Sequence, residues 1–133
     1  MTLGERRWLV NDLIKGLTWI GTRTDRYGEL VSFYRDVMGL ELEHEEHDFA
    51  LFKLPDGSKA EVFGPSDDEH RYFDTGPVAG FLVEDIDSAR AHLESGGAEF
   101  IGPVHRWPAT GEAWSHFRAP DGNVYEISQP ATK

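Results

Sequence analysis

Two glutamates stand at matching places in two similar stretches of this chain. The stretches are "PDGSKAE" and "PDGNVYE", which end at Glu61 and Glu126, and in each the glutamate follows the glycine by four residues. Two matched carboxylates can belong to a metal site or to an acid/base pair, or they can remain from a duplication without any chemistry. The Pro-Asp-Gly tripeptides favour type I turns between antiparallel strands, with proline second and glycine fourth.

The histidines offer one candidate for acid/base chemistry. His116, in "WSHFR", lies on a predicted strand and is either a general base with a carboxylate partner such as Glu126, or a structural or ligand-contacting histidine, which we favour. The stretch "HEEHD" at 44–48 is not a zinc motif, because its histidines are three residues apart and face opposite sides of a strand. We expect the remaining candidates at the surface: His70, His92 and His105.

Length and composition predict one soluble globular domain over residues 1–133. The 133 residues are 39% hydrophobic and 28% charged, which is typical of a folded chain with its own core. Because there is no cysteine, disulfides, thiolate catalysis and thiolate-held metals are excluded, and a reducing cytoplasm is the expected location. We expect no membrane span, because no stretch approaches the ~18 apolar residues required. The N-terminal residues show no signal-peptide pattern, and Trp8 there is expected to pack against the body of the protein.

The chain is strongly acidic, with a formal net charge of −11. Nucleic acid is therefore excluded as a partner, since binding phosphates requires clustered lysine and arginine. The charge either attracts cationic ligands or serves general solubility, and charge alone favours the second interpretation.

The order of predicted elements repeats. Residues 14–64 give a strand, the helical stretch "DRYGELVSFYRDVMG", two further strands, the first Pro-Asp-Gly turn and a last strand. Residues 78–129 repeat the order, with Asp85 as the expected N-cap of a helix whose apolar stripe is Ile86, Ala89 and Leu93. Residues 65–77 are polar and form a linker by composition. The fold class is therefore α+β, with two βαβββ units that must pack together because each exposes an apolar sheet face.

The stretches "FYRDVMGLELE" and "APDGNVYEI", together with the paired units, resemble the vicinal oxygen chelate superfamily, which includes glyoxalase I, bleomycin resistance proteins, extradiol dioxygenases and methylmalonyl-CoA epimerase. The resemblance runs from about Ile14 to Gln129. It implies a cupped, partly barrel-like mixed sheet with helices outside, a small-molecule ligand and a homodimer. It does not fix the reaction, because this scaffold carries many chemistries.

The resemblance also implies where a metal would bind. In metal-using members the first and last strands of each unit supply the ligands, and the last-strand positions match Glu61 and Glu126. The first-strand positions match Trp19 and Val78, neither of which can bind a metal. We therefore expect no metal and no other cofactor, because two carboxylates alone hold a divalent ion only weakly.

We expect a ligand cavity that joins the two glutamates to aromatic and apolar residues. Trp107 and Trp114 bracket an inserted loop, "WPATGEAW", which has the composition of a defined turn and the position of a lid. Trp19 either lines the cavity, where it would stack on a planar or cationic ligand, or fills it. The expected lining residues are Trp19, Glu61, Phe63, Val78, Phe81, Trp107, Trp114, His116 and Glu126.

The hypothesis that follows is a metal-independent binder of a drug or metabolite, resembling the bleomycin resistance proteins. The alternative is a lyase or isomerase of the glyoxalase–epimerase type with Glu126 as its base and a weakly held divalent metal. Extradiol dioxygenase chemistry is disfavoured, because its iron needs two histidines and a carboxylate. A scaffold or regulatory protein without a small ligand is the third possibility.

Overall fold

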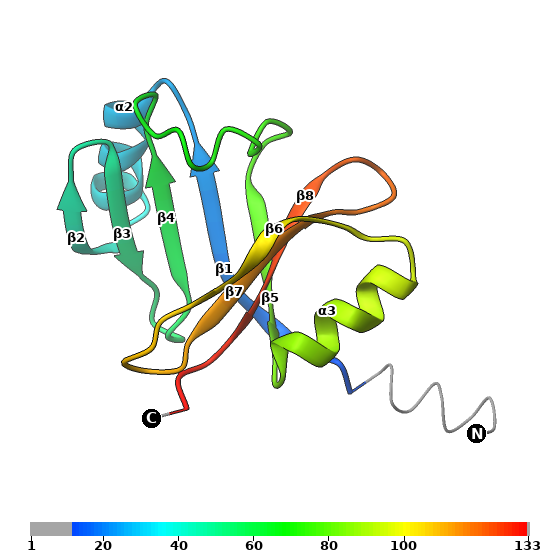
Figure 1. Cartoon of the computed structure of the whole chain (residues 1–133). Helices are drawn as coiled ribbons and strands as arrows, with labels where there is room; N and C mark the ends of the chain where they lie inside the picture. Colours follow the sequence, from blue (N-terminus) through cyan, green and yellow to red (C-terminus); the bar gives the residue numbers. More distant parts are fainter. Residues whose placement is uncertain (1–11, 133) are drawn as a thin grey trace. The chain divides into compact units, whose positions relative to one another are not determined.

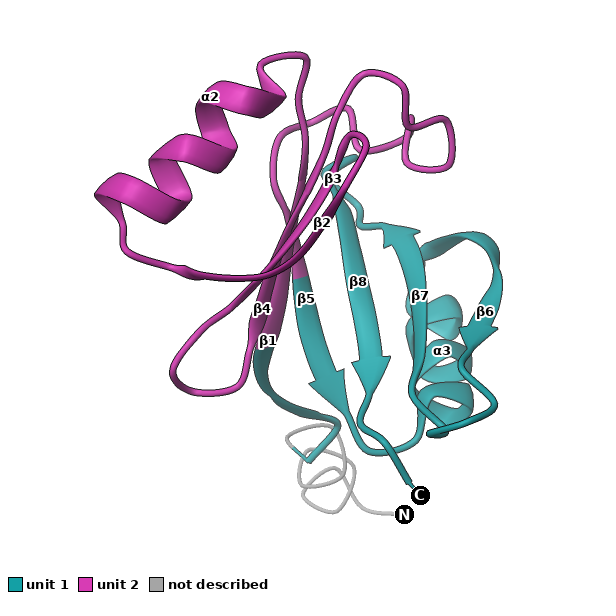
Figure 2. Cartoon of the chain, turned by 90° about the vertical axis from the view of Figure 1, so that its left-hand side faces the viewer, with its two compact units in different colours: residues 1–17, 80–133 teal, residues 18–79 magenta. Residues whose placement is uncertain are grey.

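The computed structural model describes residues 12–132 and divides the chain into two compact units. We call residues 18–79 unit 2, and residues 1–17 together with 80–133 unit 1 (Figure 2). Figure 1 labels the helices and strands described below. Trp8, expected to pack against the body, lies outside the described residues. Within residues 12–132, none of the helices has the length and apolar character needed to cross a membrane.

Unit 2 contains the first strand–helix–strand–strand–strand series. Its four strands are hydrogen-bonded in the order β2-β3-β4-β1, with β1 parallel to β4 and the other neighbours antiparallel. The elements are β1 (Ile14–Arg23, of which the last six residues belong to this unit), α2 (Tyr27–Ser32), the π-helix η1 (Phe33–Val37), β2 (Glu41–Glu46), β3 (Phe49–Lys53) and β4 (Lys59–Phe63).

The predicted Pro-Asp-Gly turns are confirmed in both units. In unit 2 the Gly57 N–H donates to the carbonyl oxygen of Leu54 at 3.0 Å, and in unit 1 the Gly122 N–H donates to that of Ala119 at 2.9 Å. Both glycines have a positive φ, 89° and 86°, which a residue with a Cβ adopts only at a cost. The two turns therefore fix the start of β4 and of β8 in the same way.

The helical stretch of unit 2 is not one continuous α-helix. After α2 the chain widens into η1, where the Met38 N–H donates to the Phe33 carbonyl oxygen, five residues back, at 2.9 Å. The extra residue in this turn shifts the apolar stripe that the sequence predicted. Val31 is buried, whereas Phe33 and Val37 are 50% and 70% exposed.

The sheet of unit 2 has one face packed against the helix and one free of it. Alternate residues of β3 and β4 pack against Val31 on the helix side. The intervening residues, Leu51 on β3 and Glu61 and Phe63 on β4, point the other way, and we call this side the helix-free face of unit 2. The residues packed on the helix side are Ala50, Phe52, Ala60 and Val62.

Unit 1 repeats the series with strands hydrogen-bonded in the order β5-β8-β7-β6. Asp85 is the N-cap of α3, as predicted, because its carboxylate accepts hydrogen bonds from the N–H groups of Asp87 and Ser88 at 3.1 and 3.3 Å. Ile86 and Ala89 of the predicted stripe are completely buried against the sheet. The elements are β5 (Val78–Val83, of which the last four residues belong to this unit), α3 (Ile86–Ser95), β6 (Glu99–Arg106), β7 (Ala113–Arg118) and β8 (Val124–Gln129).

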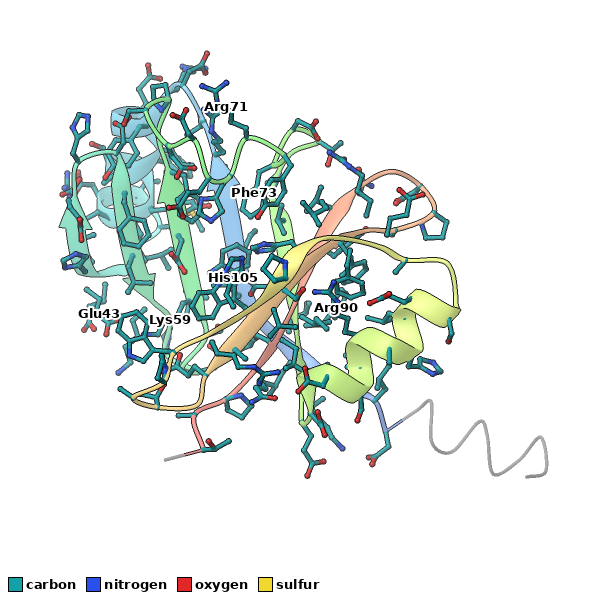
Figure 3. All side chains as sticks on the ribbon, viewed as in Figure 1. Glu43, Lys59, Arg71, Phe73, Arg90 and His105 are labelled. Atoms are coloured by element: carbon teal, nitrogen blue, oxygen red, sulfur yellow. The ribbon has the colours of Figure 1, made fainter. Side chains whose placement is uncertain are left out.

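Arg90 ties α3 to the sheet beneath it. Its guanidinium lies 4.7 Å from the centre of the Phe100 ring and donates to the Gly102 carbonyl oxygen at 3.0 Å and to Ser115 Oγ at 3.2 Å (Figure 3). The helix therefore stays on one side of this sheet, and the other side is the helix-free face of unit 1. The fold class expected from the sequence, α+β with two βαβββ units, is confirmed.

Candidate functional site

The helix-free face of unit 2 brings together Trp19 and Glu61. Trp19 and Gly21 lie on one face of β1, because residues two apart in a strand share a face, and Gly21 is the register partner of Glu61 on β4. The indole Nε1–H of Trp19 donates to Glu61 Oε1 at 2.7 Å. An indole nitrogen is therefore a direct partner of the carboxylate that the resemblance assigned to a metal.

Gly21 makes room for the indole ring of Trp19. A Cβ placed at Gly21 would lie 2.0 Å from Cη2 of Trp19, so the ring lies directly over the backbone of this glycine. Trp19 is partly buried rather than completely covered. The register partner of Trp19 on β4 is Lys59, whose Nζ donates to Glu43 at 3.2 Å (Figure 3).

Aromatic rings from the segment after β4 extend this face. Phe73 is 5% exposed and meets the Trp19 ring edge-on, with ring centres 6.1 Å apart (Figure 3). His70 stacks on Phe63 with ring centres 4.0 Å apart and an angle of 23°. The expectation that His70 is a surface residue is therefore wrong, since its side chain is only 19% exposed. We call Trp19, Glu61, Phe63 and Phe73 the aromatic–acidic face.

No role is predicted for Phe73 or Gly21 from the sequence alone. The signal for Phe73 was the aromatic pair in "HRYFD", which is unusual in an otherwise polar linker. For Gly21 no signal exists, because a glycine in a strand has many causes.

Unit 1 buries a histidine–glutamate pair. His116 on β7 and Glu126 on β8 are register partners, and His116 Nε2 lies 3.0 Å from Glu126 Oε1. The two residues are 2% and 5% exposed. The carboxylate partner suggested for His116 is therefore in place.

Burial sets the protonation of this pair. It raises the pKa of Glu126 well above its usual range and lowers the pKa of His116 to about 4, because a charge is poorly solvated at either place. Both shifts favour a neutral carboxyl group and a neutral imidazole over an ion pair of the two. A proton can therefore move between the two groups along this hydrogen bond without a change in the net charge of the pair.

Phe81 does not share a face with this pair. Its ring packs against Tyr125 with ring centres 5.9 Å apart, among the residues that cover α3. Tyr125 and Glu126 are neighbours on β8 and so point to opposite faces. The expectation that Phe81 lines the cavity is thus corrected, because Phe81 lies on the face of β5 that packs against the core beneath α3. Val78, three residues earlier, is completely buried.

The loop between β6 and β7 is a defined turn, as its proline and glycine suggested. The Trp107 N–H donates to the Glu112 carbonyl oxygen, and the Gly111 N–H donates to the Trp107 carbonyl oxygen, each at 2.8 Å. Trp107 is 57% exposed, while Trp114 is partly buried and stacks on His105 with ring centres 5.7 Å apart. Whether the loop acts as a lid stays a prediction.

The donor set does not fit the divalent metal that the family resemblance implies. Trp19 has no lone pair to offer, and its N–H donates to Glu61. In unit 1, His116 and Glu126 supply only two groups that could bind a metal, and these two are hydrogen-bonded to each other. Among residues 12–132, no three histidine or acidic side chains are grouped so that they could hold a metal ion. We therefore derive no step that passes through a metal.

Comparison with known proteins supports the expected family. The model of the Glyoxalase/Bleomycin resistance protein/Dioxygenase superfamily matches residues 16–127. No curated protein matches the sequence.

Solved structures show the same fold. Methylmalonyl-CoA epimerase from Mycobacterium tuberculosis is 22% identical, with a TM-score of 0.67 over 90% of this chain and 91% of that chain. A superfamily member from Vibrio splendidus is 18% identical, with a TM-score of 0.64 over 86% and 98%. The epimerase from Streptomyces coelicolor, in complex with 2-nitronate-propionyl-CoA, is 18% identical with a TM-score of 0.64 over 90% and 99%.

Proposed function

Since this chain belongs to the Glyoxalase/Bleomycin resistance protein/Dioxygenase superfamily, we propose that it binds a small organic molecule without a metal ion, through the aromatic–acidic face of unit 2. The hydrogen bond from Trp19 to Glu61 carries this proposal. It occupies the carboxylate with an aromatic N–H and at the same time holds the indole ring in one orientation.

A ring held in this way is suited to stacking. The Glu61 bond, the contact with Phe73 and the close approach to Gly21 restrict the indole before any ligand arrives, so binding loses little further side-chain freedom. The Glu61 carboxylate brings a negative charge and acceptor oxygens next to the indole ring, which complement a cation or an N–H donor. The ligand class that this chemistry favours is a planar aromatic molecule with a positive charge or an N–H donor.

N-methylquinolinium, a planar aromatic cation, is a direct probe of the proposal. We expect it to bind in isothermal titration calorimetry, and we expect Glu61→Gln to weaken binding about tenfold, because a charge-assisted contact worth about 1.4 kcal/mol becomes a neutral one. Glu41→Gln removes the same charge from an exposed position on β2 and is the matched control. Binding should be unchanged in EDTA. Equal affinity of wild type and Glu61→Gln would refute the assignment.

The second candidate is a lyase or isomerase that moves a proton next to a carbonyl group. The observation that favours it is the buried pair of His116 and Glu126, since a carboxyl group with a raised pKa suits acid/base work near neutral pH. The structural likeness to methylmalonyl-CoA epimerases is compatible with it but extends to the fold alone. Glu126 would be the base. Once a turnover is found, its loss in Glu126→Gln supports this candidate, and full activity of that variant eliminates it.

A further inference from the structure

We infer that Asp67 and His70 are positioning residues for the aromatic–acidic face: together they form a clamp that fixes the segment after β4, holds Phe73 against Trp19 and so keeps the Trp19–Glu61 hydrogen bond in place. The clamp lies in residues 65–77, which the sequence marked only as a linker. The ligand-affinity part of this inference rests on the proposed function. The part concerning Trp19 does not.

The clamp is a compact set of hydrogen bonds within one short turn. The Asp67 carboxylate accepts from the backbone N–H of His70 at 3.1 Å and lies 3.0 Å from its ring Nδ1. The two side chains are 17% and 19% exposed. A carboxylate with two such partners fixes both the position and the orientation of the imidazole.

The clamp is attached to the sheet through Arg23. This residue lies on the same face of β1 as Trp19 and Gly21, because the three alternate along the strand. Its Nε donates to the Asp67 carbonyl oxygen at 3.0 Å, and its Nη2 donates to the Pro65 carbonyl oxygen at 3.2 Å. Two bonds from one planar guanidinium leave the segment little freedom to slide along the strand.

From the clamp the contacts lead to Trp19 through two rings. The His70 ring stacks on Phe63, and the Phe73 N–H donates to the His70 carbonyl oxygen at 3.0 Å, which places Phe73 one turn further on. The Phe73 ring is 5.0 Å from that of His70 and 6.1 Å from that of Trp19, measured between centres. A change at Asp67 therefore alters the wall against which the indole packs.

The neighbouring residues supply a matched control. Asp68 and Arg71 form an ion pair with the same spacing of three residues, but their side chains are 73% and 71% exposed. An exposed pair of this kind contributes little to structure. Asp67→Asn and Asp68→Asn remove the same charge from adjacent positions, and only the first touches the clamp.

The test follows the indole N–H resonance of Trp19 in a proton–nitrogen correlation spectrum, assigned by its loss in Trp19→Phe. In Asp67→Asn we expect this resonance to move and its hydrogen exchange to speed up at least about tenfold. We expect N-methylquinolinium to bind about fivefold more weakly. Asp68→Asn should match the wild type in all three measurements. An Asp67→Asn protein with a cooperative unfolding transition and an unmoved Trp19 resonance overturns the inference.

Two substitutions at His70 separate its hydrogen bond from its ring. His70→Asn retains an N–H donor near Nδ1 and loses the stacking on Phe63, whereas His70→Phe retains the stacking and loses the donor. We expect His70→Phe to displace the Trp19 resonance as Asp67→Asn does, and we expect His70→Asn, which loses only the ring contacts, to displace it less. The opposite ranking shows that the stacking positions Phe73 and refutes the clamp. If the probe fails to bind the wild-type protein while Asp67→Asn still moves Trp19, the proposed function fails and the clamp stands.

Discussion

At the scale of single residues, the identity of position 19 decides which chemistry the first unit can support. A histidine there would offer a lone pair towards Glu61, whereas the indole of Trp19 offers only an N–H and donates it to that carboxylate. The same substitution adds a large flat ring to the sheet face, edge-on to Phe73. Tryptophan at this position thus supplies an aromatic surface and an N–H donor, but no atom that could bind a metal.

Gly21→Ala tests how closely the indole depends on its neighbour. The added methyl group would overlap the Trp19 ring, so the ring must move, and this strains its hydrogen bond to Glu61. We expect a loss of about 1–3 kcal/mol in the free energy of unfolding, measured with urea, and a displaced Trp19 indole resonance.

The control for this substitution is Gly28→Ala in α2. A Cβ at Gly28 meets nothing within 4 Å, and alanine favours a helix over glycine, so this variant should be unchanged or slightly more stable. A Gly21→Ala protein that behaves like Gly28→Ala would contradict the described packing of the ring.

Glu126→Gln tests the protonation of the buried pair. The folded-state pKa of Glu126 is raised, so its contribution to stability is complete at low pH and is lost as the pH rises towards the folded pKa. The folded-state pKa of His116 is lowered from 6.5 to about 4, so its contribution is complete above 6.5 and is lost as the pH falls through that range. Below pH 6.5 the two groups change the unfolding free energy in opposite directions as the pH rises. Above pH 6.5 only Glu126 changes it.

We therefore expect the unfolding free energy of the wild type to fall as the pH rises from about 6.5 towards the raised folded pKa of Glu126, by at most about 1.4 kcal/mol per pH unit. Glu126→Gln cannot titrate, so its curve should be flatter there and the variant should gain on the wild type as the pH rises. Parallel curves from urea unfolding would show that Glu126 is already ionised in the folded protein.

At the scale of elements, the features that the sequence predicted correctly are local ones. The Pro-Asp-Gly turns and the Asp85 N-cap each depend on a few consecutive residues whose backbone preferences agree with the fold. The order of strands and helices followed from alternation and helical spacing for the same reason.

The features that the sequence did not predict depend on contacts between residues far apart in the chain, or on which face of a strand a residue occupies. Trp19 and Glu61 are 42 residues apart, and only the β1–β4 register brings them together. Phe81 was assigned to the wrong face, because an apolar run such as "VAGFLV" fits a strand with either parity. The π-helix was not predicted, because its wider hydrogen bonds shift the helix by one residue and the spacing of apolar residues does not reveal such a shift.

Asp85→Ala tests the start of α3. Loss of the carboxylate leaves the N–H groups of Asp87 and Ser88 without this acceptor, and we expect the unfolding free energy to fall by about 1 kcal/mol. Asp85→Ser keeps a capping oxygen and should lose much less, as measured by urea unfolding under identical conditions. Equal losses in the two variants would assign the effect to charge rather than to capping.

At the scale of the whole molecule, the net charge of −11 acts on any charged ligand. A cation is attracted from a distance, and dissolved salt screens this attraction over about 10 Å at 0.1 M. The net charge of the chain therefore adds a long-range attraction for a cation to the short-range attraction of the Glu61 carboxylate.

We expect the affinity for N-methylquinolinium to fall several-fold when the salt concentration rises from about 0.05 to 0.5 M. The affinity for quinoline, its neutral analogue above pH 7, should not fall. Calorimetric titrations of the two probes at both concentrations measure this difference. A salt response shared by both probes would show that the net charge has no part in binding.

The close approach of the Trp19 ring to Gly21 also constrains how this sequence could have arisen. Glycine at position 21 accepts many residues at 19, but tryptophan in this orientation accepts only glycine at 21, since a Cβ there would lie 2.0 Å from the ring. The order of replacements that keeps the ring in this position throughout is therefore glycine at 21 first and tryptophan at 19 second. The reverse path is restricted in the same way, because position 21 can take a side chain only after the indole is gone.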